Sequence, residues 1–148
     1  MLQKLFNNKL RVLFFLILVT ALVCVRIFEK QLFYDPFLAY FKQDFINLSL
    51  PIFDIIKLFL SLTFRFFLNS SISLLIIYIV FNDLEIIKFA SIIYLLLFLI
   101  LTISFYIVLN FYPESKMILF YIRRFMIQPI LLMLFLAGFY FQKNKAMV

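Results

Sequence analysis

The 148-residue sequence contains no histidine, no tryptophan, one cysteine and one glycine. Without histidine, the chain lacks the usual imidazole base, the usual zinc or haem ligand and a Cys–His pair. The single glycine, Gly138, excludes a glycine-rich phosphate-binding loop, and the single cysteine, Cys24, cannot form an internal disulfide. No catalytic constellation is recognisable, so we expect a protein that is not an enzyme and binds no metal or cofactor.

Charged residues are also scarce, at 14% of the chain, whereas 67% of the residues are apolar. Soluble domains carry about a quarter charged residues, and a chain of this length has too small an interior to bury so many apolar side chains. The mean hydropathy is +1.15, and several apolar runs have the length of about twenty residues that crosses a bilayer. The composition therefore predicts an integral membrane protein.

Four apolar segments predict an all-α fold, with four transmembrane helices in an antiparallel bundle and one membrane domain over residues 1–148. The turn between the second and third segments is so short that only an antiparallel helical hairpin fits it. The first segment follows a basic start, as in a signal peptide, but no small-residue cleavage site follows. We expect the spans at about 12–28, 55–81, 86–109 and 117–141.

The longest connection, residues 29–54, is rich in apolar residues. Asp35 and Pro36 are typical of a helix start, because Asp accepts the first free amide hydrogens and Pro tolerates the first turn. We expect a short helix from there to about Ile46, lying in the membrane interface on the periplasmic side. This helix should end before Pro51.

The net charge of +7 does not indicate nucleic-acid binding, because the basic residues do not cluster on one wetted face. Lysines in tails, loops and helix ends are typical of membrane anchoring and orientation. The tail before the first span has three cations and no acid, so we expect both termini in the cytoplasm. Cations of loops and tails favour this orientation by six to four, although counting the membrane arginines on the outer side gives six to eight. The three cations of the first tail are Lys4, Lys9 and Arg11.

Four arginines fall inside apolar segments, where a charge near the bilayer centre costs several kcal/mol. Because the spans alternate in direction, Arg26, Arg65 and the pair Arg123-Arg124 should all lie toward the same membrane face. No acidic residue lies in the apolar interior of a span. The arginines must therefore find loop carboxylates, lipid phosphate or an anion on another protein. The candidate loop carboxylates are Glu29, Asp35, Asp44, Asp54 and Glu114.

Three of these arginines also have an ordinary structural explanation. Arg26 can pair with Glu29 three residues later in the chain. Arg123 and Arg124 lie only about one turn into the fourth span and can extend to the lipid headgroups. For these three residues, the sequence leaves a structural role and a binding role open.

Arg65 is harder to explain as a membrane anchor, since it lies about two turns into the second span. We expect Arg65 and Asn69, one turn further, to face the bundle or a partner. In the fourth span, Gln128 precedes Pro129, whose ring removes a helical hydrogen bond and frees the carbonyl of Phe125. Gln128 could bind that carbonyl or reach Asn69, and hydrogen bonds of this kind can join helices without any ligand.

Two motifs of the chain are specific when taken together: the loop motif around Asp35 and the double-arginine motif Arg123-Arg124. The residues that belong with them are Val25–Glu29, Leu32–Phe41, Arg65 with Asn69, and Tyr121–Phe125 with Gln128 and Pro129. With these residues, the chain resembles the exosortase F system-associated proteins over nearly its whole length. These are small integral membrane proteins of Gram-negative bacteria that are encoded beside an exosortase.

The resemblance implies an inner-membrane accessory protein. Exosortases themselves resemble multi-span transpeptidases that use Cys, Arg and His, and this chain has no His. The resemblance therefore implies a non-enzymatic accessory subunit that contacts an exosortase-like membrane protein, or its substrate, through an arginine-rich outer-leaflet face. The residues of that face would be Arg26, Arg65, Asn69, Arg123, Arg124 and Gln128.

Two other functions remain open at this point. The stronger alternative is a membrane protein that binds an anionic lipid or a polyprenyl phosphate through Arg65, Arg123 and Arg124. The weaker one is a small oligomeric channel, since rings of arginine can favour anions. In each case we expect membrane lipid among the partners and no nucleic acid.

Overall fold

The computed structural model describes residues 8–145. This part of the chain forms helices and no β-strand. In chain order, the helices are α2 (Lys9–Ile27), α3 (Glu29–Leu32), α4 (Phe37–Tyr40), α5 (Ile55–Phe81), α6 (Leu84–Phe111), α7 (Lys116–Ile127) and α8 (Ile130–Lys145).

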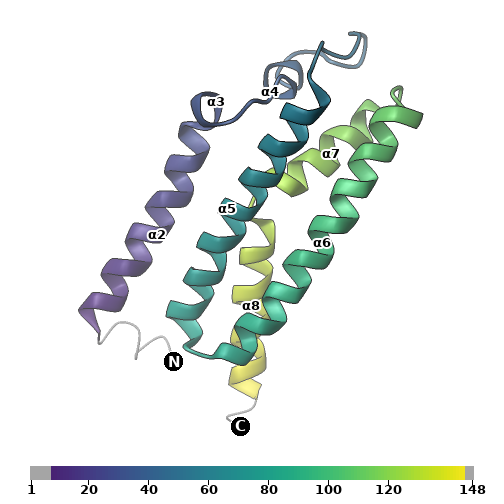
Figure 1. Ribbon diagram of the computed structural model, residues 1–148. Coiled ribbons are helices and arrows are strands. Elements are labelled where there is room, and N and C mark those ends of the chain that lie inside the picture. The colour runs from purple at the N-terminus through teal and green to yellow at the C-terminus, as the bar shows by residue number, and fades with distance from the viewer. Residues whose placement is uncertain (1–7, 146–148) are drawn as a thin grey trace.

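Three of these helices, α2, α5 and α6, are long and apolar enough to cross a membrane. The bent pair of α7 and α8 passes the same test when the two helices are taken together, so the chain has three or four candidate spans. Figure 1 shows α5, α6 and α8 side by side, with α2 packed at the edge against α5. The start of α2, the α5–α6 turn and the end of α8 lie at the same end of the molecule (Figure 1).

The hairpin of α5 and α6 follows from residues that end and begin helices. Asp54 begins α5 by accepting hydrogen bonds from the amides of Ile56 and Lys57, at 3.0 and 3.2 Å. Asn82 ends the helix in the left-handed region, with φ of 49°, a conformation that Asn tolerates better than most residues. Asp83 then begins α6 by accepting from the amide of Glu85 at 3.1 Å. The short turn brings the two helices together antiparallel.

The predicted fourth span is not one straight helix. α7 ends at Ile127, α8 begins at Ile130, and their axes differ by 61°. Gln128 is extended, with ψ of 136°, because the ring of the following Pro129 disfavours helical geometry in the residue before it. The result is that α7 lies across one end of the bundle while α8 runs back along α5 and α6 (Figure 1).

The prediction of a helix from Asp35 to Ile46 is wrong. α4 is only four residues long, Phe37–Tyr40, and the carboxylate that was expected to cap it is engaged elsewhere. The hydroxyl of Tyr40 donates to the carbonyls of Phe45 and Leu48, at 3.0 and 3.1 Å. These bonds turn the chain back over the bundle, so the connection folds onto the protein instead of continuing as a helix.

The core is centred on α5 and is closed at one end by this connection. Phe37 is fully buried, and its ring lies 5.3 Å from Phe53 and 6.3 Å from Phe105 of α6, between ring centroids. Many apolar side chains of α2 and α6 point outward; α2 has no buried residue at all. Such an apolar exterior suits a lipid environment.

Candidate functional site: an arginine–carboxylate cluster

Arg65 lies in the interior, with 1% of its surface exposed. Its Nη2 donates to Oε2 of Glu29, the first residue of α3, and its Nη1 lies 3.7 Å from Oδ2 of Asp35. The guanidinium also stands 5.1 Å from the ring centroid of Phe33, where the face of the ring favours a cation. A guanidinium two turns inside an apolar helix is therefore held by two carboxylates that come from the connection before that helix.

Arg123 of α7 binds Asp35 with two of its nitrogens. Its Nε donates to both carboxylate oxygens, at 3.2 and 3.1 Å, and its Nη2 donates to Oδ2. The side chain of Asp35 is 2% exposed, and the ring of Phe41 lies 5.7 Å from the Arg123 guanidinium. This fork-like geometry is the one that arginine provides and lysine does not.

These residues form a single ionic cluster, which we define as Arg26, Glu29, Asp35, Arg65 and Arg123. Arg26 completes it by donating to Oε2 of Glu29 at 2.9 Å. Removing a buried charge from its partners is costly because desolvation is then uncompensated. Three guanidiniums and two carboxylates leave the cluster with one excess positive charge.

Two of the predicted arginines remain accessible. The Arg26 side chain is 55% exposed, and Arg124 is exposed on α7. Arg124 donates from Nε to Oε1 of Gln128 at 3.1 Å, the residue that directly follows the end of α7. The structure thus brings Arg26, Arg65 and Arg123 together, whereas the polar contact of Arg124 is with Gln128.

The sequence left open a hydrogen bond between Gln128 and Asn69. In the structure each of the two side chains hydrogen-bonds to a different partner. The Nδ2 of Asn69 donates to the carbonyl of Ile127 at 2.7 Å, one of the carbonyls left without a helical partner by the break at Pro129. Ser73 in turn donates to the carbonyl of Asn69 at 2.7 Å. Asn69 therefore joins α5 to the end of α7.

The loop carboxylates divide into two groups. Glu29 and Asp35 bind membrane arginines, whereas Asp54 caps α5 and lies 3.6 Å from Nζ of Lys57. The backbone hydrogen bond from Lys57 holds the pKa of Asp54 below its ordinary value. Within residues 8–145, Asp44 has no ion pair. Of the five candidate loop carboxylates, only Glu29 and Asp35 thus belong to the cluster.

Two further side chains hold the connection in place. Lys116, at the start of α7, donates from Nζ to the carbonyls of Ile46 and Leu48, at 2.9 and 2.7 Å. Tyr40 donates to the same stretch of chain, and burial raises the pKa of its phenol. These contacts fasten the connection over the cluster.

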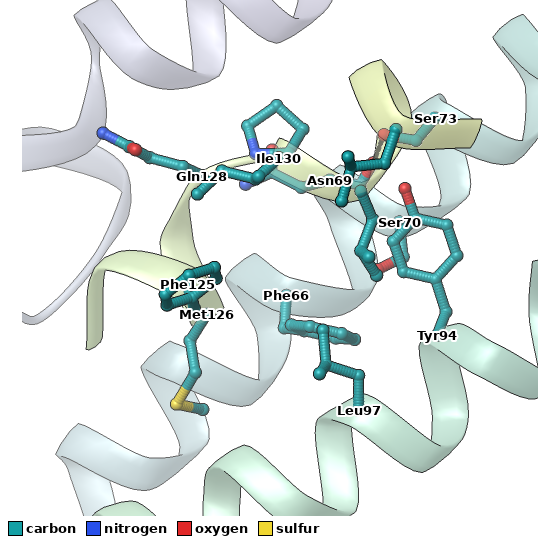
Figure 2. A pocket seen from close by; sticks show the side chains of 13 residues that line it. Phe66, Asn69, Ser70, Ser73, Tyr94, Leu97, Phe125, Met126, Gln128 and Ile130 are labelled. Atoms are coloured by element: carbon teal, nitrogen blue, oxygen red, sulfur yellow. Dashed lines mark hydrogen bonds between the residues drawn. The ribbon is translucent and has the colours of Figure 1, made fainter. Parts of the chain in front are cut away.

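A small cavity of about 90 Å³ lies beside the α7–α8 junction. Figure 2 shows Asn69, Ser70 and Tyr94 around it, and the side chain of Gln128 points away from it with the amide nitrogen outermost. Gln128 also lines a larger groove, of about 430 Å³. The residues lining this groove are Leu22, Val23, Val25, Arg26, Ile27, Arg65, Asn69, Ile127, Gln128, Pro129, Ile130 and Met133.

A third hollow, of about 190 Å³, adjoins the groove. It shares Arg26, Ile127 and Gln128 with the groove and adds Arg123 and Arg124. Four arginines, Arg26, Arg65, Arg123 and Arg124, thus line one or both of these hollows. The described residues contain no group of three or more His, Cys, Asp or Glu side chains that could hold a metal ion.

Sequence reasoning did not find Phe33, Phe41 or Lys116. The aromatic residues are two among 23 phenylalanines, and nothing in their spacing distinguishes a ring that covers a guanidinium from one that faces lipid. Lys116 precedes the predicted fourth span and counted only as one of the loop cations on the outer side. Comparison of the chain with known protein families, characterised proteins and solved structures finds no match.

Proposed function

We propose that this protein is a non-enzymatic accessory subunit of a bacterial protein-sorting complex of the exosortase type, in the inner membrane with both termini in the cytoplasm. The proposal is supported by one feature above all: the exposed face of α7. This face carries two aromatic residues, a methionine and an arginine, all exposed. They are Met117, Tyr121, Arg124 and Phe125.

The spacing of these residues puts them on one side of the helix. Met117 and Phe125 each lie four residues from Tyr121, and Arg124 lies three residues from it, so all three side chains neighbour Tyr121 on one surface. Aromatic residues, methionine and arginine are the types enriched in protein interfaces, and tyrosine and arginine contribute strongly to binding. The four side chains are exposed, and the helix that carries them lies across one end of the bundle (Figure 1).

The ionic cluster has a different part in this proposal. Arg65 and Arg123 are buried and bound to Glu29 and Asp35, so they do not contact a partner directly. They attach both α7 and the connection of residues 29–54 to α5. This attachment determines the direction in which Arg124 points. Its two terminal guanidinium nitrogens are then available for a carboxylate of the partner.

The experiment is co-purification of the full chain from its native membrane in a mild detergent. We expect a membrane protein to be retained in fixed stoichiometry, and Arg124→Glu to abolish its retention because the charge at the contact is reversed. Lys88→Glu is the matched control. Lys88 is exposed near the start of α6, away from the end of the bundle that α7 crosses. Absence of a stoichiometric protein, or equal retention by both variants, contradicts the proposal.

A further inference from the structure

We propose that the groove between α2, α5 and the α7–α8 junction binds one anionic phospholipid. The headgroup phosphate would lie against Arg26, Arg65 and Gln128, and an acyl chain would lie between α2 and α8. The inference does not depend on the proposed function, because the exposed face of α7 is not part of this groove.

The first argument is that side chains with unused hydrogen-bond donors line the groove. Arg65 lines it and is buried, yet its Nε and Nη1 have no hydrogen-bond partner. Gln128 gives its oxygen to Arg124 and turns its amide nitrogen away from the small cavity (Figure 2). Arg26 is more than half exposed and uses one nitrogen for Glu29. Three neighbouring side chains therefore offer N–H groups to an acceptor.

The second argument is charge. The ionic cluster has three guanidiniums and two carboxylates, so one positive charge is not balanced by the protein. Away from bulk water, such a charge is stabilised by an anion at short range. A phosphate monoanion supplies the missing charge and several acceptor oxygens, and arginine binds phosphate with two parallel hydrogen bonds.

The third argument concerns the rest of the groove, which is apolar. Leu22, Val23, Ile130 and Met133 extend from the arginines along α2 and α8. No hydrogen-bonding side chain occurs among these four residues, so this part of the groove suits a hydrocarbon chain and not a hydrated ion. A ligand with a phosphate at one end and an acyl chain at the other matches both parts, and a phospholipid of the surrounding membrane has this chemistry.

The test uses the full chain, purified in mild detergent and mixed with equal amounts of phosphatidylglycerol and phosphatidylcholine that carry the same acyl chains. Native mass spectrometry then measures which lipid is retained. We expect phosphatidylglycerol to be retained about tenfold more than phosphatidylcholine, because both lipids carry the same phosphate and only the cationic choline of phosphatidylcholine opposes the excess positive charge of the cluster. Millimolar inorganic phosphate should not displace it, because the acyl chain contributes to binding.

Two variants test the arginine end and the apolar part of the groove separately. Arg26→Gln should bring the retention of the two lipids close to equality, and Met133→Trp should lower the retention of both because the indole fills the apolar part. Their controls are Lys88→Gln and Leu96→Trp, at exposed positions outside the groove. If Arg26→Gln does not fold, Gln128→Leu tests the same end without breaking an ion pair.

Three outcomes would overturn the proposal. The first is equal retention of the two lipids by the unsubstituted protein. The second is that Met133→Trp retains as much phosphatidylglycerol as Leu96→Trp. The third is displacement of the lipid by inorganic phosphate, which would show that the site recognises a free anion.

Discussion

Arg65 of α5 and Arg26 of α2 bind the same carboxylate oxygen, Oε2 of Glu29. This shared contact joins the end of the first long helix to the interior of the second. The arginines in apolar segments suggested a binding surface. Their charge is in part neutralised by carboxylates of the connection between α2 and α5. Their burial makes the cluster a determinant of how the helices pack, and each of its pairs can be tested separately.

The first prediction concerns Arg65 and Glu29. Arg65→Leu should lower the free energy of unfolding by about 3 kcal/mol, because it leaves a buried carboxylate without its main partner. The double variant Arg65→Leu with Glu29→Gln should regain part of this loss, since the uncompensated charge is then removed as well. Titration of the detergent-solubilised protein with a denaturing detergent, followed by circular dichroism, measures these differences.

Arg124→Leu is the control for this pair, because Arg124 is exposed and has no ion pair in the described chain. We expect its effect on unfolding to be within about 0.5 kcal/mol, as for most surface substitutions. Unchanged stability in Arg65→Leu, or a double variant no more stable than Arg65→Leu alone, would show that the buried pair does not hold the fold together.

The second prediction distinguishes charge from geometry at Arg123. Lysine keeps the positive charge but lacks the fork that contacts both oxygens of Asp35. Arg123→Lys should therefore lower stability by about 1–3 kcal/mol, the contribution of hydrogen bonds between charged groups. Arg124→Lys, on the same helix and exposed, should have little effect. Equal stability of the two lysine variants would mean that only charge matters at Arg123.

Much of the fold follows from the sequence, because apolar length and capping residues act locally. The predicted second span, 55–81, covers the same residues as α5, and the third lies within α6. Asp54 and Asp83 mark helix starts that any reading of capping residues would find. Local signals of this kind depend only on a few neighbouring residues.

Two predictions from the sequence fail: the length of the helix after Asp35 and the straight fourth span. Asp35 before Pro36 has the form of a helix start, but its carboxylate binds Arg123, 88 residues later in the chain, and the helix that begins there, α4, ends at Tyr40 instead of continuing to Ile46. Pro129 was expected to free a carbonyl, yet the sequence did not show that the chain would bend by 61° there. Contacts between distant segments decide both cases, and no local pattern encodes them.

The third prediction concerns the bend itself. Asn69→Ala removes the donor to the carbonyl of Ile127 and leaves that buried group unsatisfied, which should cost about 1–3 kcal/mol. Asn110→Ala is the matched control, because Asn110 also donates to a backbone carbonyl, that of Tyr106 at 3.0 Å, but at an exposed position. If the two alanine variants are equally stable, the bend does not depend on Asn69.

The last prediction concerns orientation in the membrane. The start of α2, the α5–α6 turn and the end of α8 lie at one end of the molecule (Figure 1), so the loops at this end should share one side of the membrane. The tail before α2 is basic and contains no acid, which favours the cytoplasm for that end. The connection that carries the ionic cluster should then face the periplasm.

Single cysteines introduced in a Cys24→Ser background measure this directly, because an impermeant thiol reagent labels only the outer face of intact spheroplasts. We expect Gln43→Cys, in the connection, to be labelled, and Asn144→Cys, near the end of α8, to be labelled only after the cells are broken. Labelling of Asn144→Cys but not Gln43→Cys in intact cells would reverse the orientation. Labelling of both would require an even number of crossings between them, as when α5 and α6 cross the membrane and the α7–α8 pair does not.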